Sequence, residues 1–185
     1  KGVPHVCRDR AGRYRLYDTD ELLRLPPPTW QVQDVIPAGG LVGLYGPPGC
    51  GKSFLALDIA LCVASGLPWQ DKLTVPGWVV YISAEGGTGI GKRGLAWLTK
   101  HGIRAEDVEI AWLVESIPIH ADSEQMATLL NRIIHEIDQP VSLIIIDTLA
   151  RCFDGDENQQ EDMGRFIAGI DINPCFFVVH LAPFS

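Results

Sequence analysis

One short segment constrains this chain more than any other. Residues 46–53 are Gly-Pro-Pro-Gly-Cys-Gly-Lys-Ser, which fits the pattern G-x-x-x-x-G-K-[ST] in full. An apolar run, Leu41–Tyr45, precedes the segment, and the helix-forming residues 54–57 follow it. In this order of strand, glycine-rich loop and helix, backbone N–H groups and a helix N-terminus can surround a phosphate. The segment therefore predicts a P-loop within an α/β domain.

Each residue type of this loop has a physical task. The glycines let the backbone turn so that its N–H groups point inward at phosphate oxygens. We expect Lys52 to contact the β- and γ-phosphates of a nucleotide, and the Ser53 hydroxyl to hold Mg²⁺. Cys50 is either a small spacer or a sensitive thiol. The predicted nucleotide-binding residues are Gly46, Pro47, Pro48, Gly49, Cys50, Gly51, Lys52, Ser53 and Phe54.

Around the loop, short apolar runs alternate with segments of helical periodicity. Strands are predicted over 41–45, 78–83, 110–114, 143–146 and 175–180, and helices over 52–65, 91–101, 122–139 and 161–170. This alternation predicts a twisted, mostly parallel sheet with helices on both faces. A chain of 185 residues is long enough for one such domain and too short for two. We expect an N-terminal approach segment over 1–30 and the domain over 31–185, with its C-terminal end incomplete.

A second apolar run ends in a carboxylate. Residues 142–146 lead directly into Asp147, far downstream of the P-loop, which is the form of a Walker B motif. At the C-terminal end of a parallel strand, Asp147 is expected to lie in the ligand crevice and to reach Mg²⁺. Many P-loop ATPases have a glutamate at the next position, where this chain has Thr148. The base for hydrolysis must therefore come from a neighbouring strand.

Glu85 is the predicted general base. It follows the apolar run 78–84 and is itself followed by two glycines, so it is expected at the same edge of the sheet. The alternative is a surface carboxylate at a strand-to-loop turn. His180, at the end of the last predicted strand, is either a sensor of the γ-phosphate or a half-buried histidine. Lys92 and Arg93 either approach phosphate or a neighbouring subunit, or lie on a solvated helix face.

Composition excludes several classes of protein. The net charge of −8 argues against a large basic nucleic-acid surface, although not against a small internal one. Five widely spaced cysteines without a Cys-x-x-Cys pair argue against a zinc site or a disulfide framework and favour a cytoplasmic protein. No apolar stretch reaches the roughly 18 residues that a membrane span needs. No Asn-Lys-x-Asp guanine-reading element is present, so ATP is favoured as the nucleotide.

Four segments together resemble one family. Residues 44–58, Ala-Glu-Gly-Gly at 84–87, Asp-Thr-Leu-Ala-Arg at 147–151, and Val-Val-His at 178–180 look like the RepA-like branch of the RecA-fold ATPases. That branch comprises the replicative helicases of phages and plasmids and their relatives. The resemblance implies that the strand ending at His180 lies between the P-loop strand and the Walker B strand. It also implies that Glu85 is the catalytic glutamate and His180 the phosphate sensor.

The same resemblance implies cofactors and partners. It implies ATP and Mg²⁺ bound at the interfaces of a homo-oligomeric ring, usually a hexamer, with single-stranded DNA in the channel and an arginine finger supplied in trans. The alternative is a nucleotide-dependent regulatory or assembly module that does not translocate DNA. The net charge of −8 and the acidic segment 154–162 favour this alternative, because their sign is wrong for contact with phosphates.

Overall fold

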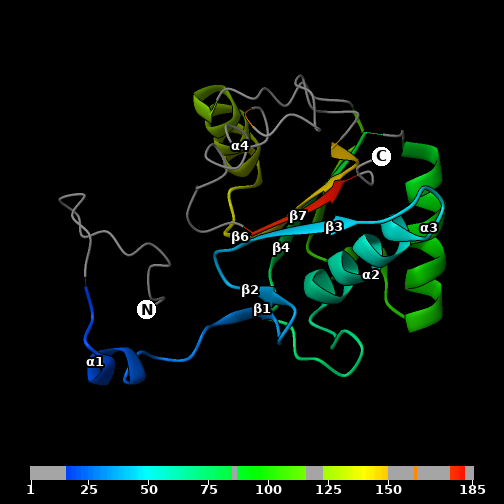
Figure 1. The fold of residues 1–185 in the computed structure, drawn as a ribbon. Helices are drawn as coiled ribbons and strands as arrows, with labels where there is room; N and C mark the ends of the chain where they lie inside the picture. Colours follow the sequence, from blue (N-terminus) through cyan, green and yellow to red (C-terminus); the bar gives the residue numbers. More distant parts are fainter. Residues whose placement is uncertain (1–15, 85–86, 116–122, 150–160, 162–175, 182–185) are drawn as a thin grey trace.

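The computed structural model describes residues 16–84, 87–115, 123–149, 161 and 176–181 (Figure 1). Its centre is a five-stranded sheet in the order β3-β7-β6-β4-β5, and every neighbouring pair in it is parallel. The strands are Leu41–Tyr45 (β3), Trp78–Ser83 (β4), Ile110–Leu113 (β5), Val141–Asp147 (β6) and Phe176–Leu181 (β7). The predicted α/β class is confirmed, and so is the place of the strand carrying His180, between β3 and β6.

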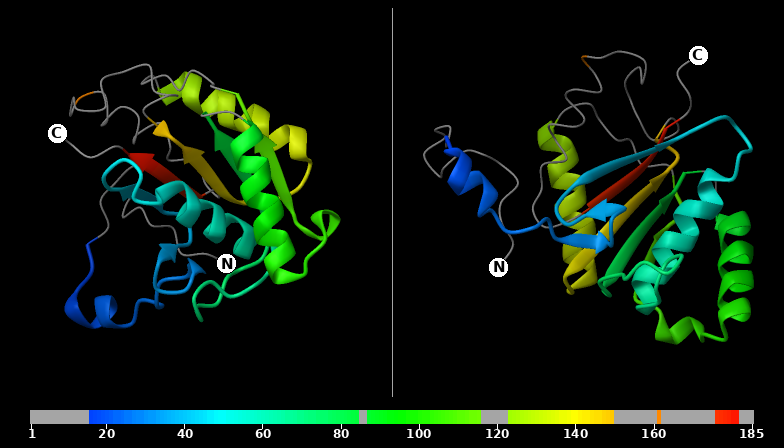
Figure 2. Two further views of the ribbon diagram at one scale, coloured as in Figure 1. Left: turned by 90° about the vertical axis from the view of Figure 1, so that its right-hand side faces the viewer. Right: turned by 60° about the horizontal axis from the view of Figure 1, so that its bottom comes forward.

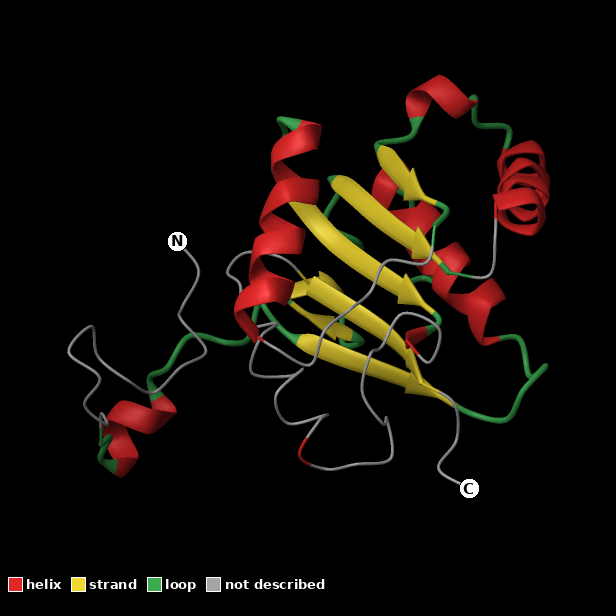
Figure 3. Ribbon diagram, turned by 90° about the horizontal axis from the view of Figure 1, so that it is seen from above, coloured by secondary structure: helices red, strands yellow, loops and turns green. Residues whose placement is uncertain are grey.

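Helices cover both faces of this sheet, as predicted. The covering helices are Lys52–Ser65 (α2), Gly87–His101 (α3) and Ser123–Ile137 (α4). The short helix Thr19–Leu23 (α1) has no buried residue and lies apart from the sheet (Figure 1), and a 3-10 turn, Ala105–Asp107 (η1), precedes β5. The views agree that α2 and α3 lie side by side on one face and that α4 lies on the other (Figures 1, 2 and 3). Among the described residues, no helix is long and apolar enough to cross a membrane.

The core lies between the central strands and α2. Residues 143–146 of β6 are wholly buried, as are Val79, Tyr81 and Ile82 of β4. Strands covered on both faces are apolar at successive positions instead of alternating, which explains the continuous run before Asp147. Helix α2 is buried over most of its circumference, including Ala56, Ala60 and Val63, because it packs directly on β4 and β6.

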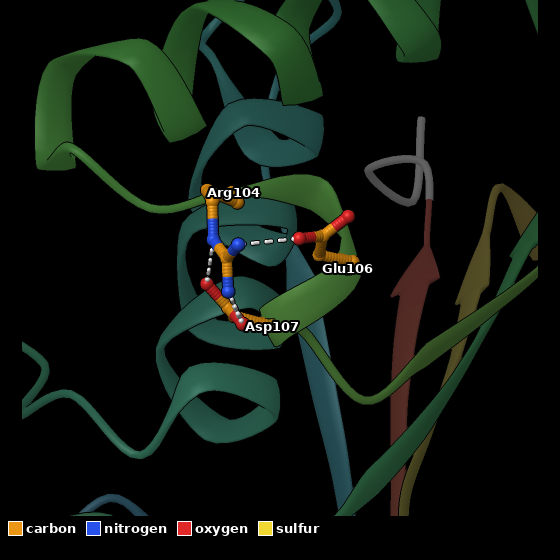
Figure 4. A network of polar contacts seen from close by, with 3 residues as sticks. All are labelled: Arg104, Glu106 and Asp107. Atoms are coloured by element: carbon orange, nitrogen blue, oxygen red, sulfur yellow. Dashed lines mark hydrogen bonds and ion pairs between the residues drawn. The ribbon is translucent and has the colours of Figure 1, made fainter.

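The turn between α3 and β5 is held by one cation and two acids. The guanidinium of Arg104 donates two hydrogen bonds of 2.8 Å to the carboxylate of Asp107 and lies 2.6 Å from Glu106 (Figure 4). The hydrogen bond from Arg104 lowers the pKa of Asp107. All three side chains are exposed, and exposed ion pairs contribute little to stability. This network is therefore a local surface feature of the 3-10 turn, and we assign it no chemistry.

Several predicted boundaries were wrong by a few residues. Helix α3 begins at Gly87, four residues before the predicted start, because glycines at 87, 89 and 91 weaken the helical signal of its first turns. Strand β6 begins at Val141, two residues early, while β5 ends at Leu113 and α4 lies within the predicted 122–139. The helix predicted over 161–170 lies outside the described residues, apart from Glu161.

A small antiparallel pair was not predicted at all. Strand Trp30–Val32 (β1) pairs with Ile36–Pro37 (β2), and Val32 also bridges to Thr74. Strands of three and two residues are too short to show a periodic pattern. Even so, Val32 and Ile36 are almost wholly buried and belong to the main core. The pair therefore packs the chain ahead of β3 against the domain.

Candidate functional site

The P-loop connects the end of β3 to the start of α2. Gly49 and Gly51 have φ angles of 76° and 93°, in the left-handed region where side chains are strained. A Cβ added at either position would meet no described atom within 4 Å. The glycines are therefore required by backbone conformation and not by close packing, and the space above them is open to a ligand.

The first backbone N–H groups of α2 lie beside this space. The carbonyl of Gly51 accepts the first helical bond, from the N–H of Leu55 at 3.0 Å. The N–H groups of Lys52, Ser53 and Phe54 come before that bond, and no side chain of a described residue caps the helix at Gly51. Such N–H groups, together with the partial positive charge of the helix end, form an anion site.

The ammonium of Lys52 lies inside the loop. Its Nζ donates hydrogen bonds to the carbonyls of Gly46 at 2.6 Å and Pro47 at 2.8 Å, and the residue is only 8% exposed. Among the described residues, no carboxylate pairs with Lys52. Its charge is therefore met by carbonyl dipoles and the Cys50 thiol and by no carboxylate of the described residues, so a bound phosphate would find an uncompensated cation there.

Ser53 and Asp147 meet across the site. The Ser53 hydroxyl donates to Oδ1 of Asp147 at 2.9 Å, and Asp147 is 4% exposed at the end of β6. Mg²⁺ prefers oxygen ligands and usually takes one or two carboxylates together with phosphates of the substrate. A hydroxyl and a carboxylate side by side beside a phosphate loop fit that ion. The two predicted metal ligands are thus brought together, 94 positions apart in the sequence.

Tyr81 is a site residue that the sequence analysis missed. Its hydroxyl donates to Oδ2 of Asp147 at 2.7 Å, and its side chain is fully buried. Burial, and then the charge of Asp147, raise the pKa of this phenol, so the hydroxyl remains a donor. The available signal was a tyrosine within an apolar strand, since a buried hydroxyl needs a partner.

Of the predicted base and the predicted phosphate sensor, only the sensor lies within the described residues. Glu85 lies outside the described residues; the N–H of the preceding residue, Ala84, donates to the carbonyl of Asp147 at 2.8 Å. The backbone of His180 in β7 pairs with Leu44 in β3, two residues before Gly46. His180 is therefore placed at the edge of the sheet from which the P-loop leaves. The roles of Glu85 and His180 stay predictions.

Arg93 and Lys92 also have different environments. The guanidinium of Arg93 lies over the ring of Phe54, 5.1 Å from its centroid, and the residue is half-buried. Its charge acts on the buried hydroxyl of Tyr81, whose pKa it lowers slightly against the larger opposing effects. Lys92 is exposed. Of the two cations, Arg93 is thus the one held against the start of α2.

A cleft runs from the P-loop along the groove between α2 and α3. Its volume is about 580 Å³. The cleft is lined by backbone of the loop and by aromatic and charged side chains of both helices, among them Gly51, Lys52, Phe54, Asp58, Trp97 and Lys100. The anion site is therefore part of a larger concave surface, as expected where a ligand binds.

Comparison with known protein families agrees with this geometry. Residues 8–172 match the family model AAA_25, which is described as an AAA domain. No protein with a curated description matches the sequence significantly. The family match spans the P-loop, the strand that ends at Asp147 and all the strands of the sheet except β7. The chain therefore belongs to this AAA domain family of P-loop NTPases.

Proposed function

We propose that the chain is a Mg²⁺-dependent ATPase of the RepA-like replicative helicase type, acting on single-stranded DNA as a homo-oligomeric, hexameric ring in the cytoplasm. The observation that carries the ATPase part is the contact between Ser53 and Asp147. It unites the P-loop with the Walker B strand, and it fits the metal of a Mg–nucleotide. The helicase part rests on the resemblance of the motifs around Glu85, Asp147 and His180.

In this mechanism the chain's own residues bind and orient the nucleotide. The N–H groups at the start of α2 and the Lys52 ammonium bind the phosphate oxygens and offset their charge. Ser53 and Asp147 would hold Mg²⁺, which would supply positive charge to offset that of the phosphates. Glu85 orients the attacking water and accepts its proton. His180 contacts the γ-phosphate, and an arginine from the neighbouring subunit completes the site.

A regulatory or assembly ATPase that does not move along DNA is the second candidate. The net charge of −8 and the acidic segment 154–162 favour it, since neither suits a surface for phosphates. In this case the same residues bind and slowly hydrolyse ATP, and DNA has no effect on the rate.

Steady-state ATP hydrolysis, measured with and without single-stranded DNA, tests both candidates. Lys52→Ala serves as the blank, since it removes the cation inside the P-loop, and circular dichroism checks that this variant is folded. Hydrolysis abolished in Lys52→Ala and stimulated severalfold by DNA supports the helicase. Hydrolysis indifferent to DNA supports the regulatory module. A chain that binds no Mg–ATP in equilibrium dialysis would overturn both.

A further inference from the structure

The two oxygens of the Asp147 carboxylate have different partners. Oδ1 accepts from the Ser53 hydroxyl at 2.9 Å, and Oδ2 accepts from the Tyr81 hydroxyl at 2.7 Å. These partners come from α2 and from β4, on separate elements of the fold. With both oxygens bound, the plane of the carboxylate is fixed relative to the P-loop.

The register of the sheet explains why Tyr81 can reach Asp147. Tyr81 pairs with Ile145, and Ser83 pairs with Asp147, so Tyr81 and Asp147 are diagonal neighbours on one face of two parallel strands. Side chains in this relation come within reach of each other when one of them is long and aromatic. The ring of Tyr81 is also held from the next strand, because the ring centroid of Trp112 lies 5.4 Å away. The packing of the Tyr81 ring therefore orients its hydroxyl toward Asp147.

Because both side chains are buried, loss of the contact between Tyr81 and Asp147 would have a large effect on the carboxylate. Tyr81 is fully buried and Asp147 is 4% exposed, so water does not readily replace the phenol as a donor. A carboxylate that loses one of its few partners in such a place is both destabilised and free to rotate. Groups that hold a metal ligand from behind commonly alter metal affinity when they are removed.

We propose that Tyr81 is a positioning residue for the metal carboxylate: its hydroxyl holds Oδ2 of Asp147 so that Oδ1 faces Ser53 and the Mg²⁺ of a bound nucleotide. This inference rests on the proposed function, because it takes Asp147 as a metal ligand. Tyr81 acts through Asp147 and does not itself contact nucleotide or metal.

Tyr81→Phe tests the proposal, since it removes one oxygen and keeps the ring. The measurement is the binding of a fluorescent ATP analogue at a series of Mg²⁺ concentrations, with hydrolysis as a second readout. We expect the Mg²⁺ concentration at half-saturation to rise about tenfold. The affinity for the nucleotide without Mg²⁺ should stay as in the wild type, because the P-loop is untouched.

Val79→Ala is the matched control for lost stability. Val79 is also fully buried in β4, two residues before Tyr81 and on the same face, but it has no polar atom to offer Asp147. We expect Val79→Ala to lower the melting temperature and to leave the Mg²⁺ requirement unchanged. An unchanged Mg²⁺ requirement in Tyr81→Phe, or an equal rise in Val79→Ala, would overturn the proposal.

A double-mutant cycle separates action through Asp147 from an independent effect. In an Asp147→Asn background, adding Tyr81→Phe should change the Mg²⁺ requirement by much less than tenfold, because the carboxylate it positions is gone. Full additivity would contradict the positioning role. If binding of the analogue to the wild-type chain does not depend on Mg²⁺, the metal site of the proposed function is refuted. If the wild-type chain depends on Mg²⁺ and Tyr81→Phe has the same Mg²⁺ requirement, only the inference about Tyr81 is refuted.

Discussion

The carboxylate of Asp58 accepts a hydrogen bond of 2.6 Å from the indole N–H of Trp97, which joins α2 to α3. Its other oxygen accepts from the indole of Trp69 at 2.9 Å, on the segment that leads to β4. One turn earlier in both helices, Arg93 lies over Phe54. The two helices therefore run side by side in the same direction, and the helix that begins just after Glu85 is fixed against the P-loop helix.

Replacing Asp58 by alanine should destabilise the domain. The indole N–H groups of the buried Trp69 and the half-buried Trp97 would lose their acceptor, and each such loss costs on the order of 1–3 kcal/mol, so we expect a fall of about 2–6 kcal/mol in the free energy of unfolding. Urea denaturation followed by tryptophan fluorescence measures this. Glu136→Ala, at an exposed position of α4, is the control and should change stability by less than about 0.5 kcal/mol. Equal stabilities of the two variants would show that the indole contacts contribute nothing.

Gly77 should tolerate no side chain. It stands directly before β4, and an added Cβ would overlap Oγ of Ser142 and lie 3.0 Å from its Cβ. We expect Gly77→Ala to lower the free energy of unfolding by about 1–3 kcal/mol, because the Ser142 hydroxyl must rotate away and its Cβ must move to make room. In a Ser142→Gly background the same substitution should cost clearly less.

The matched control for this prediction is Gly91→Ala. An added Cβ at Gly91, within α3, would meet no described atom within 4 Å. Alanine there should stabilise the helix by roughly 0.5–1 kcal/mol, since glycine has the higher entropy in the unfolded chain. A Gly77→Ala variant as stable as the wild type, or an equal cost with and without Ser142, would refute the steric argument.

The sequence predicted the elements around the P-loop better than the rest of the fold. Leu41–Tyr45, Lys52–Ser65 and Trp78–Ser83 have the predicted bounds in the structure. Each combines a strong local pattern with an adjacent glycine, so local rules suffice. The meeting of Ser53 with Asp147 also followed from a general rule, because ligand sites lie at the carboxyl ends of parallel strands.

The contacts that hold the site in place were beyond such rules. The bond between Tyr81 and Asp147 depends on the register of β4 against β6, and that between Asp58 and Trp97 on how α3 packs on α2. Neither register nor helix packing has a local signature in one sequence. Asp58 lies inside an apolar helix, so the sequence pattern showed only a polar residue that interrupts an apolar run. Its two indole partners are revealed by the tertiary structure alone.

Cys50 should react selectively with maleimides. It is exposed inside the P-loop, with Sγ 4.0 Å from the Lys52 ammonium, whereas Cys62 is buried in α2. Burial, and then the charge of Asp58, raise the pKa of Cys62 to about 12, so this thiol stays protonated and unreactive near neutral pH. Peptide mapping by mass spectrometry should find label on Cys50 and none on Cys62 in the folded chain.

Labelling of Cys50 should also abolish nucleotide binding, because the adduct fills the loop. Mg–ATP, added first, should slow the labelling of Cys50. Treatment with the maleimide should not change the nucleotide affinity of Cys50→Ala. This variant controls for labelling of the cysteines outside the described residues. Undiminished binding by a fully labelled wild-type chain would place the nucleotide elsewhere.

Glu85→Gln should separate binding from hydrolysis. Strand β4 ends at Ser83, which pairs with Asp147, and the N–H of Ala84 donates to the carbonyl of Asp147, so the residue just before Glu85 lies beside Asp147. Glutamine keeps the size of the side chain but cannot accept the proton of the attacking water. We expect turnover to fall about 10²- to 10⁴-fold while the affinity for Mg–ATP stays within a few fold of the wild type. Glu115→Gln, an exposed carboxylate just beyond the neighbouring strand β5, is the control and should hydrolyse ATP normally. Normal turnover in Glu85→Gln would remove Glu85 from the role of base, since no other change to the site accompanies that substitution.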